Sequence, residues 1–341
     1  NLLASLICFA IFHVNRRTRN ASLSGPHKKE KDRLMPKMSI KRSIVINAPL
    51  DKVYASVKDF RQWIEWSPWN IMDPECQVDH AEDGRSYSWD GKIIGSGGME
   101  ILEESEGQWI NYRLTFLKPF KSVSSVSFLF VETKDGVEAT WTMNGSMPFF
   151  LFFLVKMMTA GVSMDYERGL AMLKDYLETG AVPSKLEFPG RTTFPGLKYV
   201  GISETTAIAD IGPSMEAVFK KLHAWLETSG VKPAGKPLSI YETWDMVNGT
   251  AGYISCIPVS SVPADLPAGF VSGEIPSCPA YPVKHAGPYR HLGNAWSAGM
   301  AHGRAKVFKQ NKKIAPFEIY ETDPKEGPEE EAAVTVYFPV K

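Results

Sequence analysis

The stretch RSIVINAPLDKVYASVKDFRQWIEWSPW at residues 42–69 decides what fold to expect in the first half of the chain. Its apolar start predicts a β-strand, which the Asn-Ala-Pro sequence at 47–49 ends, since proline favours the first turn of a helix. Val53 and Val57 then recur at helical spacing. The aromatic run at 59–69 predicts a second, shorter helix. We therefore expect a strand followed directly by two helices.

The sequence after these helices predicts an antiparallel sheet and a closing helix. Short runs of alternating apolar and polar residues follow one another between residues 85 and 144, separated by turn residues. Leu170, Leu173 and Leu177 then repeat along a helix expected at 164–178. The order strand, helices, meander and long helix predicts an α+β fold, with a curved sheet wrapped around its C-terminal helix.

The opening motif, together with the later YSWDG, GSGGMEI and ATWTMNG, resembles the START-like superfamily (SRPBCC, polyketide cyclase and Bet v 1) over residues 40–179. The resemblance implies a hydrophobic cavity between the sheet and the last helix. Because this fold carries lipid carriers, cyclases and sensors alike, it does not decide function. Alternation makes Trp89 and Trp141 candidate ligand-binding residues, with Met99, Tyr112 and Met143 as further wall residues; the alternative for each is ordinary core packing.

A linker and a repeated unit are expected after residue 179. Residues 180–191 contain two prolines and two glycines and no periodic apolar pattern, which is typical of a linker. Beyond it, three landmarks recur in the same order at nearly the same spacing: Gly212-Pro213 and Gly287-Pro288, IYET at 240–243 and 319–322, and CIPV at 256–259 with YFPV at 337–340. We therefore predict an internal duplication, with copies at about 192–260 and 270–341, and a central cleft.

The strands of the two copies differ in one chemically important position. In FEIYET, alternation places Glu318 and Tyr320 on one face of the strand and Ile319 on the other. We expect Ile319 to face the helices, and Glu318 and Tyr320 to line a cleft between the copies. The equivalent positions in the first copy are Ser239 and Tyr241. The predicted cleft is therefore symmetric in backbone and asymmetric in chemistry.

The second half also resembles a known module. VKHAGPYRHLGNAW, PFEIYETDP and the closing VYFPV are similar to the GyrI-like effector-binding domain, over residues 192–341. That module occurs at the C-termini of multidrug-sensing bacterial activators of the AraC and MerR types. The resemblance implies an aromatic pocket whose acidic residue contacts lipophilic, often cationic ligands. Glu318 matches the acid, Tyr289 the tyrosine of the HAGPY motif, and Trp296 the aromatic residue after it.

These residues suit a cation. A carboxylate at Glu318 surrounded by Tyr320, Tyr337, Tyr289 and Trp296 would be partly desolvated, which raises its pKa unless a cation arrives. Each aromatic face would add about 0.5–2 kcal/mol through cation–π contact. Tyr241 completes the expected ligand-binding set. The alternative is that Glu318 has no binding role and is a solvated glutamate on an edge strand.

The enzyme alternative uses the same cleft. The resemblance includes hydrolases that act through the glutamate and a tyrosine of the pocket. In such a hydrolase Glu318 would be the general base, and Tyr289 or Tyr320 the acid or oxyanion donor. A third class of function is a lipid carrier that uses the N-terminal cavity.

Composition excludes several other classes. The chain has 38 basic and 38 acidic residues and a formal net charge of zero, so we expect no nucleic-acid binding by itself. The four cysteines form no CxxC pair, and no GxSxG, HExxH, P-loop or GxGxxG occurs, so neither a metal nor a cofactor is expected. The leading hypothesis is a cytoplasmic protein that binds or senses hydrophobic or cationic small molecules through two fused domains, without a DNA-binding module.

Residues 1–39 are set apart as an apolar leader and polar linker. The run LLASLICFAIFHV at 2–14 is shorter than the about 20 residues that span a bilayer. Arg16, Arg17 and Arg19 follow it, which would place the rest of the chain in the cytoplasm if the run is the end of a membrane anchor. The alternatives are an unstructured leader or a true start at Met35 or Met38.

Overall fold

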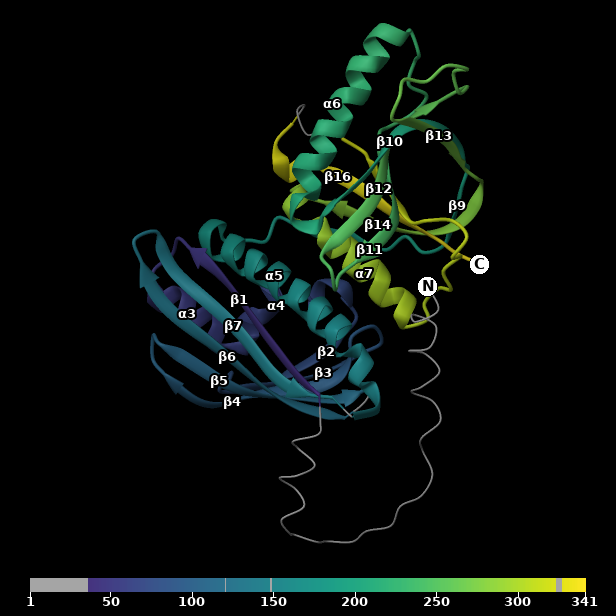
Figure 1. Cartoon of the computed structure of the whole chain (residues 1–341). Coiled ribbons are helices and arrows are strands. Elements are labelled where there is room, and N and C mark those ends of the chain that lie inside the picture. Colours follow the sequence, from purple (N-terminus) through teal and green to yellow (C-terminus); the bar gives the residue numbers. More distant parts are fainter. Residues whose placement is uncertain (1–35, 120, 148, 323–326) are drawn as a thin grey trace, which may run out of the picture. The chain divides into compact units, whose positions relative to one another are not determined.

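The computed structural model of the protein describes residues 36–119, 121–147, 149–322 and 327–341. Of the leader and linker predicted at 1–39, residues 1–35 lie outside these ranges, and residues 37–39 belong to the first β-strand. The described residues fold into two antiparallel sheets with their associated helices (Figure 1). No helix in these ranges is long and apolar enough to cross a lipid bilayer.

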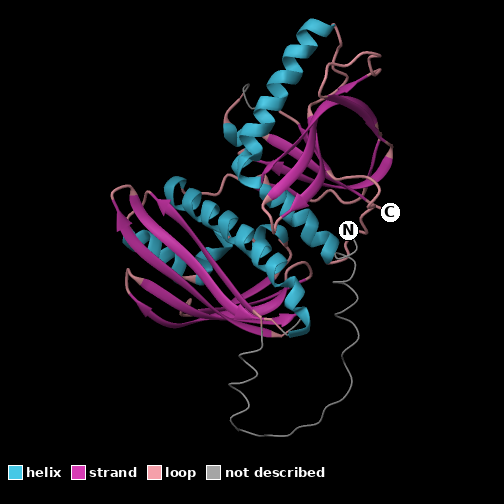
Figure 2. Ribbon diagram, viewed as in Figure 1, coloured by secondary structure: helices cyan, strands magenta, loops and turns pink. Residues whose placement is uncertain are grey.

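The N-terminal domain is a curved sheet covered by a long helix. Its elements are β1 (Lys37–Ile46), α3 (Leu50–Lys58), η1 (Phe60–Gln62), α4 (Trp63–Trp66), η2 (Asn70–Met72), β2 (Gln77–His80), β3 (Ser86–Gly91), β4 (Gly95–Ser105), β5 (Trp109–Lys118), β6 (Ser122–Thr133), β7 (Gly136–Ser146), η3 (Phe149–Leu154) and α5 (Val155–Thr179). The strand order is β1-β7-β6-β5-β4-β3-β2, with antiparallel neighbours throughout. Figure 2 shows α5 lying across one face of this sheet.

Sequence patterns explain these elements. The predicted strand and two helices are present as β1, α3 and α4, and Pro49 directly precedes α3. Helix α5 contributes Tyr166, Leu170 and Leu173 to the core that it forms with the sheet. It begins at Val155, well before the residue 164 expected from its leucine repeat. The fold class predicted from the sequence, α+β with a sheet packed on a C-terminal helix, is confirmed.

The C-terminal domain is a second sheet that curls into a half-barrel. Its elements are β8 (Lys185–Glu187), β9 (Thr192–Phe194), β10 (Leu197–Ala207), η4 (Ile208–Asp210), α6 (Ile211–Ser229), β11 (Leu238–Asp245), β12 (Thr250–Val259), β13 (Phe270–Ile275), β14 (Cys278–Ala286), η5 (Tyr289–His291), α7 (Gly293–Arg304), β15 (Phe317–Tyr320), η6 (Glu329–Glu331) and β16 (Ala333–Pro339). The order is β13-β10-β12-β11-β15-β16-β14-β8, with β9 also pairing with β14. Strand β8 lies within the predicted linker, so part of that segment belongs to this sheet.

Two strands at the middle of this sheet bring the IYET segments together. Strand β11 pairs antiparallel with β15, and Ser239 lies directly opposite Glu318. On one side of this pair the order is β11, β12 and β10, and on the other it is β15, β16 and β14. The two positions that the sequence comparison made equivalent are therefore neighbours at the centre of the sheet.

Candidate functional site

The carboxylate of Glu318 is the centre of a buried polar cluster. The residue lies on β15 and is 1% exposed. The hydroxyls of Tyr241 and Tyr320 donate hydrogen bonds to Oε1 at 2.9 and 2.7 Å. The indole Nε1 of Trp296, on α7, donates to Oε2 at 2.6 Å. Each carboxylate oxygen thus accepts from at least one neutral donor.

Burial dominates the electrostatics of this cluster. Removal from water raises the pKa of Glu318, and the hydrogen bonds from Trp296, Tyr320 and Tyr241 oppose that rise without cancelling it. Burial, with the charge of Glu318 as a further cause, also raises the pKa of Tyr241 and Tyr320 well above the ordinary tyrosine value. Both phenols therefore stay protonated and act as hydrogen-bond donors.

The cluster contains no compensating positive charge. In the described part of the chain, no Lys, Arg or His side chain forms an ion pair with Glu318. Nor do three His, Cys, Asp or Glu side chains gather in those ranges to hold a metal ion. When Glu318 is ionised, it is a buried negative charge held only by neutral groups.

Helix α6 closes the other side of the cluster. The Tyr320 hydroxyl lies 3.0 Å from Ser239 Oγ and 3.4 Å from the sulfur of Met215, on α6. Ser239 Oγ is in turn 2.9 Å from Ser255 Oγ on β12. Met215 and Ser255 are neighbours of the site that were not predicted from the sequence. Strand β12 is buried at every position from Ala251 to Val259, so no alternation along it points to Ser255.

The structure brings five of the predicted ligand-binding residues together. Tyr241, Trp296 and Tyr320 contact Glu318 directly, and the rings of Tyr241 and Trp296 meet edge-on with centroids 4.6 Å apart. Tyr289 lies beside them, with its ring centroid 6.0 Å from that of Tyr320. Its hydroxyl is 3.5 Å from the backbone oxygen of Thr322 rather than on the carboxylate.

Tyr337 does not join this group. It lies directly opposite Phe317 in the β15–β16 pair, and the two rings stack with centroids 5.1 Å apart. Because Phe317 and Glu318 are consecutive in β15, their side chains point to opposite faces. The expectation that Tyr337 lines the cleft beside Glu318 is therefore wrong.

The expected orientation of β15 also needs correction. Glu318 and Tyr320 face the helices, because they contact Trp296 on α7 and Met215 on α6. Ile319 instead packs against an apolar cluster that includes Phe194 and Tyr337. The curling of the sheet gives its second face an apolar core of its own. Alternation separates the two faces of a strand but does not say which one carries the helices.

The two candidate residues of the N-terminal domain lie apart from Glu318 and from each other. Trp141 is 1% exposed and stacks on Tyr166, with centroids 3.9 Å apart, and on Phe128 at 4.9 Å. Trp89 is half-buried, and its ring lies 5.5 and 5.9 Å from those of Tyr87 and Phe116. Trp141 thus occupies a filled aromatic core between the sheet and α5.

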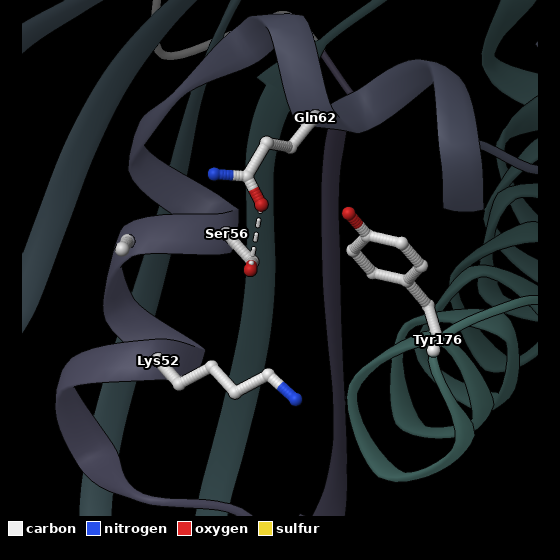
Figure 3. Close-up of a pocket in the computed structure, with 6 residues that line it drawn as sticks. Lys52, Ser56, Gln62 and Tyr176 are labelled. Carbon is white, nitrogen blue, oxygen red and sulfur yellow. Dashed lines mark hydrogen bonds between the residues drawn. The ribbon is translucent and has the colours of Figure 1, made fainter.

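A shallow pocket of about 250 Å³ lies in the N-terminal domain. Figure 3 shows Lys52, Ser56 and Gln62 on one side of it and Tyr176 across from them. Lys52 Nζ donates to the backbone oxygen of Leu177 at 2.6 Å, and Ser56 Oγ donates to Gln62 Oε1 at 2.8 Å. The lining includes an ammonium and no carboxylate, so its chemistry suits a small polar or anionic group. This pocket was not predicted from the sequence, because Lys52 and Ser56 have the polar character of the solvated face of a helix.

His285, in the HAGPY motif, is a second buried titratable group. It is 1% exposed, its Nε2 is 3.1 Å from Ser184 Oγ, and its Nδ1 is buried with no partner among the described residues. Burial, and to a lesser extent the charge of His291, lowers the pKa of His285 to about 4 from the usual 6.5. The imidazole is therefore neutral in the folded protein at physiological pH.

Acidification is expected to destabilise the fold through His285. Between about pH 6.5 and pH 4 the unfolded chain binds a proton at this residue and the folded protein does not, so stability falls as the pH is lowered. The loss at pH 5 should be about 2 kcal/mol. Urea unfolding of wild type and His285→Gln at pH 7 and pH 5 measures it. The variant should lose less stability between the two pH values, and equal losses would contradict the assignment.

Comparison with protein families agrees with this architecture. Residues 37–178 match the family described as polyketide cyclase / dehydrase and lipid transport, and residues 192–341 match the GyrI-like small molecule binding domain. The chain joins a START-like domain to a GyrI-like domain. Both resemblances predicted from the sequence are thereby confirmed. The Glu318 cluster belongs to the GyrI-like domain, and Trp141 and the Lys52 pocket belong to the START-like domain.

Several solved structures are similar at low identity. Protein MLL2253 from Mesorhizobium loti is 16% identical, with 41% of this chain and 96% of that chain covered and a TM-score of 0.33. EcmrR in its DNA complex is 15% identical, with 54% and 66% covered and a TM-score of 0.41. The di-domain ARO/CYC StfQ from the steffimycin biosynthetic pathway is 12% identical, with 44% and 53% covered and a TM-score of 0.36. No curated protein matches the sequence. These similarities are too distant to carry an argument about ligand or activity.

Proposed function

We propose that the GyrI-like domain binds lipophilic organic cations at Glu318, and that the protein senses or sequesters such compounds. The family matches support small-molecule binding in general. The observation that carries the finer proposal is a 1% exposed carboxylate with three neutral donors and no ion-pair partner among the described residues. An organic cation would supply the missing charge.

The surrounding rings suit such a ligand. A cation between Trp296, Tyr241 and Tyr289 would gain about 0.5–2 kcal/mol from each aromatic face that it contacts. To reach the carboxylate, it must displace at least one donor, since Tyr241, Tyr320 and Trp296 cover both oxygens. Binding then replaces a hydrogen bond from a neutral group with an ion pair that compensates the buried negative charge.

The same geometry favours binding over hydrolysis. Tyr320 and Glu318 are close enough to act as an acid–base pair, at 2.7 Å. A general base must also reach a water molecule, however, and the oxygens of Glu318 are buried and already accept three hydrogen bonds. The lipid-carrier alternative is less well supported, because stacked rings around Trp141 fill the core of the START-like domain.

Charge and cysteine state support a ligand-binding role in the cytoplasm. The formal net charge of zero offers no excess of basic residues for phosphates, so we propose that recognition of small molecules, rather than of nucleic acid, is the primary activity. Cys76, Cys256 and Cys278 are free thiols in the structure, which fits a reducing compartment.

Substitution of Glu318 by glutamine tests the proposal. Glu318→Gln keeps the shape of the side chain and removes the charge, so the affinity for a rhodamine-type cation should fall at least about tenfold, or 1.4 kcal/mol. Fluorescence anisotropy of rhodamine 6G measures the affinity. Glu242→Gln is the matched control, because Glu242 is an exposed glutamate on β11. Equal binding by wild type and Glu318→Gln would refute the site.

The pH dependence of binding gives an independent check on the same charge. Because burial raises the pKa of Glu318, lowering the pH should protonate the carboxylate and weaken binding of the cation. Glu318→Gln should lack this dependence.

A further inference from the structure

We infer that the START-like domain positions the cation site of the GyrI-like domain. Helix α5 holds the segment formed by η5 and α7, residues 289–304, which carries Tyr289 and Trp296 of the site. Asp175 and Arg168 on α5 make the contacts and act as positioning residues. The inference rests on the proposed function and adds that the site is complete only when the START-like domain is in place.

Asp175 binds two consecutive residues of η5. Its Oδ2 lies 2.6 Å from Nε2 of His291, which is itself buried, and 3.0 Å from Nη2 of Arg290. Arg290 also pairs with Glu329 through Nη1 at 2.8 Å. Because Asp175 is itself buried, its carboxylate depends on these two partners, and their loss would be costly.

Arg168 holds the beginning of α7. Its Nη1 donates to Oδ1 of the buried Asn294 at 2.7 Å, while its Nη2 donates to Asp165 at 2.6 Å. The amide nitrogen of Asn294 donates to Ser184 Oγ at 3.1 Å. Asn294 precedes Trp296 by two residues in the first turn of the helix, so its anchor fixes the backbone from which the Trp296 indole projects.

The far end of α7 is fixed to the START-like domain as well. Nε2 of His302 is 2.8 Å from the backbone oxygen of Met72 in η2, and its Nδ1 is 2.8 Å from the Tyr281 hydroxyl. Ala298 and Ala301 pack against Met72 in an apolar cluster. Both ends of the helix therefore contact the N-terminal half of the chain.

Helix α7 depends on these contacts because its own sequence has a low helix propensity. It contains Gly293, Gly299 and Gly303, and glycine costs about 1 kcal/mol relative to alanine inside a helix. Gly299 is required by packing, since a Cβ there would lie 2.0 Å from the Phe338 ring. The helix is thus pressed onto β16 on one side and held by α5 and η2 on another.

The position of residues 289–304 affects ligand binding. Trp296 donates to Glu318 at 2.6 Å, and Tyr289 lies against Tyr320, so a shift of residues 289–304 moves two walls of the cation site. Removing the charge of Asp175 weakens the contacts of α5 with Arg290 and His291 and allows that shift. Affinity for the cation will therefore depend on a residue of the other domain that touches neither the ligand nor Glu318.

The experiment compares two carboxylates on α5. Asp175→Asn keeps the size of the side chain and removes its charge. Glu167→Gln is the matched control, because Glu167 pairs with Arg42 inside the START-like domain. We expect Asp175→Asn to weaken rhodamine 6G binding about 5- to 10-fold and Glu167→Gln to leave it unchanged. In protein labelled with 5-fluorotryptophan, the ¹⁹F resonance of Trp296, assigned with Trp296→Phe, should shift in Asp175→Asn alone.

The two measurements separate this inference from the proposed function. If wild type binds no dye, the proposed function fails, and the ¹⁹F shift of ligand-free protein still decides whether Asp175 positions Trp296. If Asp175→Asn does not fold, as judged by circular dichroism, Arg168→Lys replaces it, since lysine keeps the charge but cannot bridge Asp165 and Asn294. A folded variant with wild-type affinity and an unmoved Trp296 resonance would overturn the inference.

Discussion

Replacing Trp141 with alanine is expected to lower the free energy of unfolding by about 3–5 kcal/mol. The indole is 1% exposed and lies between Phe128 of β6 and Tyr166 of α5, stacked on both rings. These neighbours belong to two separate layers, the sheet and the helix, so they cannot both move in to fill the space. The loss therefore includes the cavity left behind as well as the lost burial.

Urea unfolding followed by circular dichroism measures the loss, and Trp89→Ala is the matched control. Trp89 is half-buried near the edge of the sheet and contacts Tyr87 and Phe116, so its removal should cost less than about 2 kcal/mol. In a hollow lipid carrier, Trp141 would be a wall residue, and truncating it would enlarge a cavity that already exists. Equal costs for the two variants would therefore argue for a ligand cavity and against the filled core.

Local patterns in the sequence predicted the START-like fold well. The strand, the proline before α3 and the spacing of Val53 and Val57 are signals that depend only on neighbouring residues, and β1, α3 and α4 follow them. The start of α5 was missed by nine residues, at Val155 rather than 164, because its first turns lack the leucine stripe. The apolar residues also predicted which side chains form the core, but not whether the core contains a cavity. Side chains that line a cavity and side chains that pack solidly have the same apolar composition.

The Glu318 cluster was predicted in part, and the errors in its prediction have physical causes. Strand alternation and the family motifs brought Glu318, Tyr320 and Trp296 to one place. Tyr337 was predicted on the wrong face because the register in which β16 pairs with β15 cannot be derived from the sequence of one strand alone. Asp175 was missed because a contact between domains leaves no periodic signal in the sequence. The duplication itself stays a prediction. If it is correct, the equivalent positions Ser239 and Glu318 of the two copies lie opposite each other in the β11–β15 pair.

The second large effect is expected from Gly287→Ala, in the Gly-Pro landmark of the second copy. Gly287 has a φ of 131°, and a Cβ there would lie 1.9 Å from the backbone oxygen of Pro183. A residue with a side chain in this region of φ costs about 1–3 kcal/mol, and a clash with backbone adds about 1–3 kcal/mol more. We expect a loss of about 2–6 kcal/mol in the free energy of unfolding, measured in urea.

Gly212→Ala, in the landmark of the first copy, is the control that makes this prediction informative. Gly212 lies in the first turn of α6, and a Cβ there would meet nothing within 4 Å. Because alanine favours a helix over glycine, stability should stay unchanged or rise by up to about 1 kcal/mol. Similar losses in both variants would mean that the two Gly-Pro pairs have the same backbone role. The geometry argues otherwise: Gly212 lies within a helix, whereas Gly287 lets the chain pass against Pro183 immediately before Tyr289, which lies beside the Glu318 cluster.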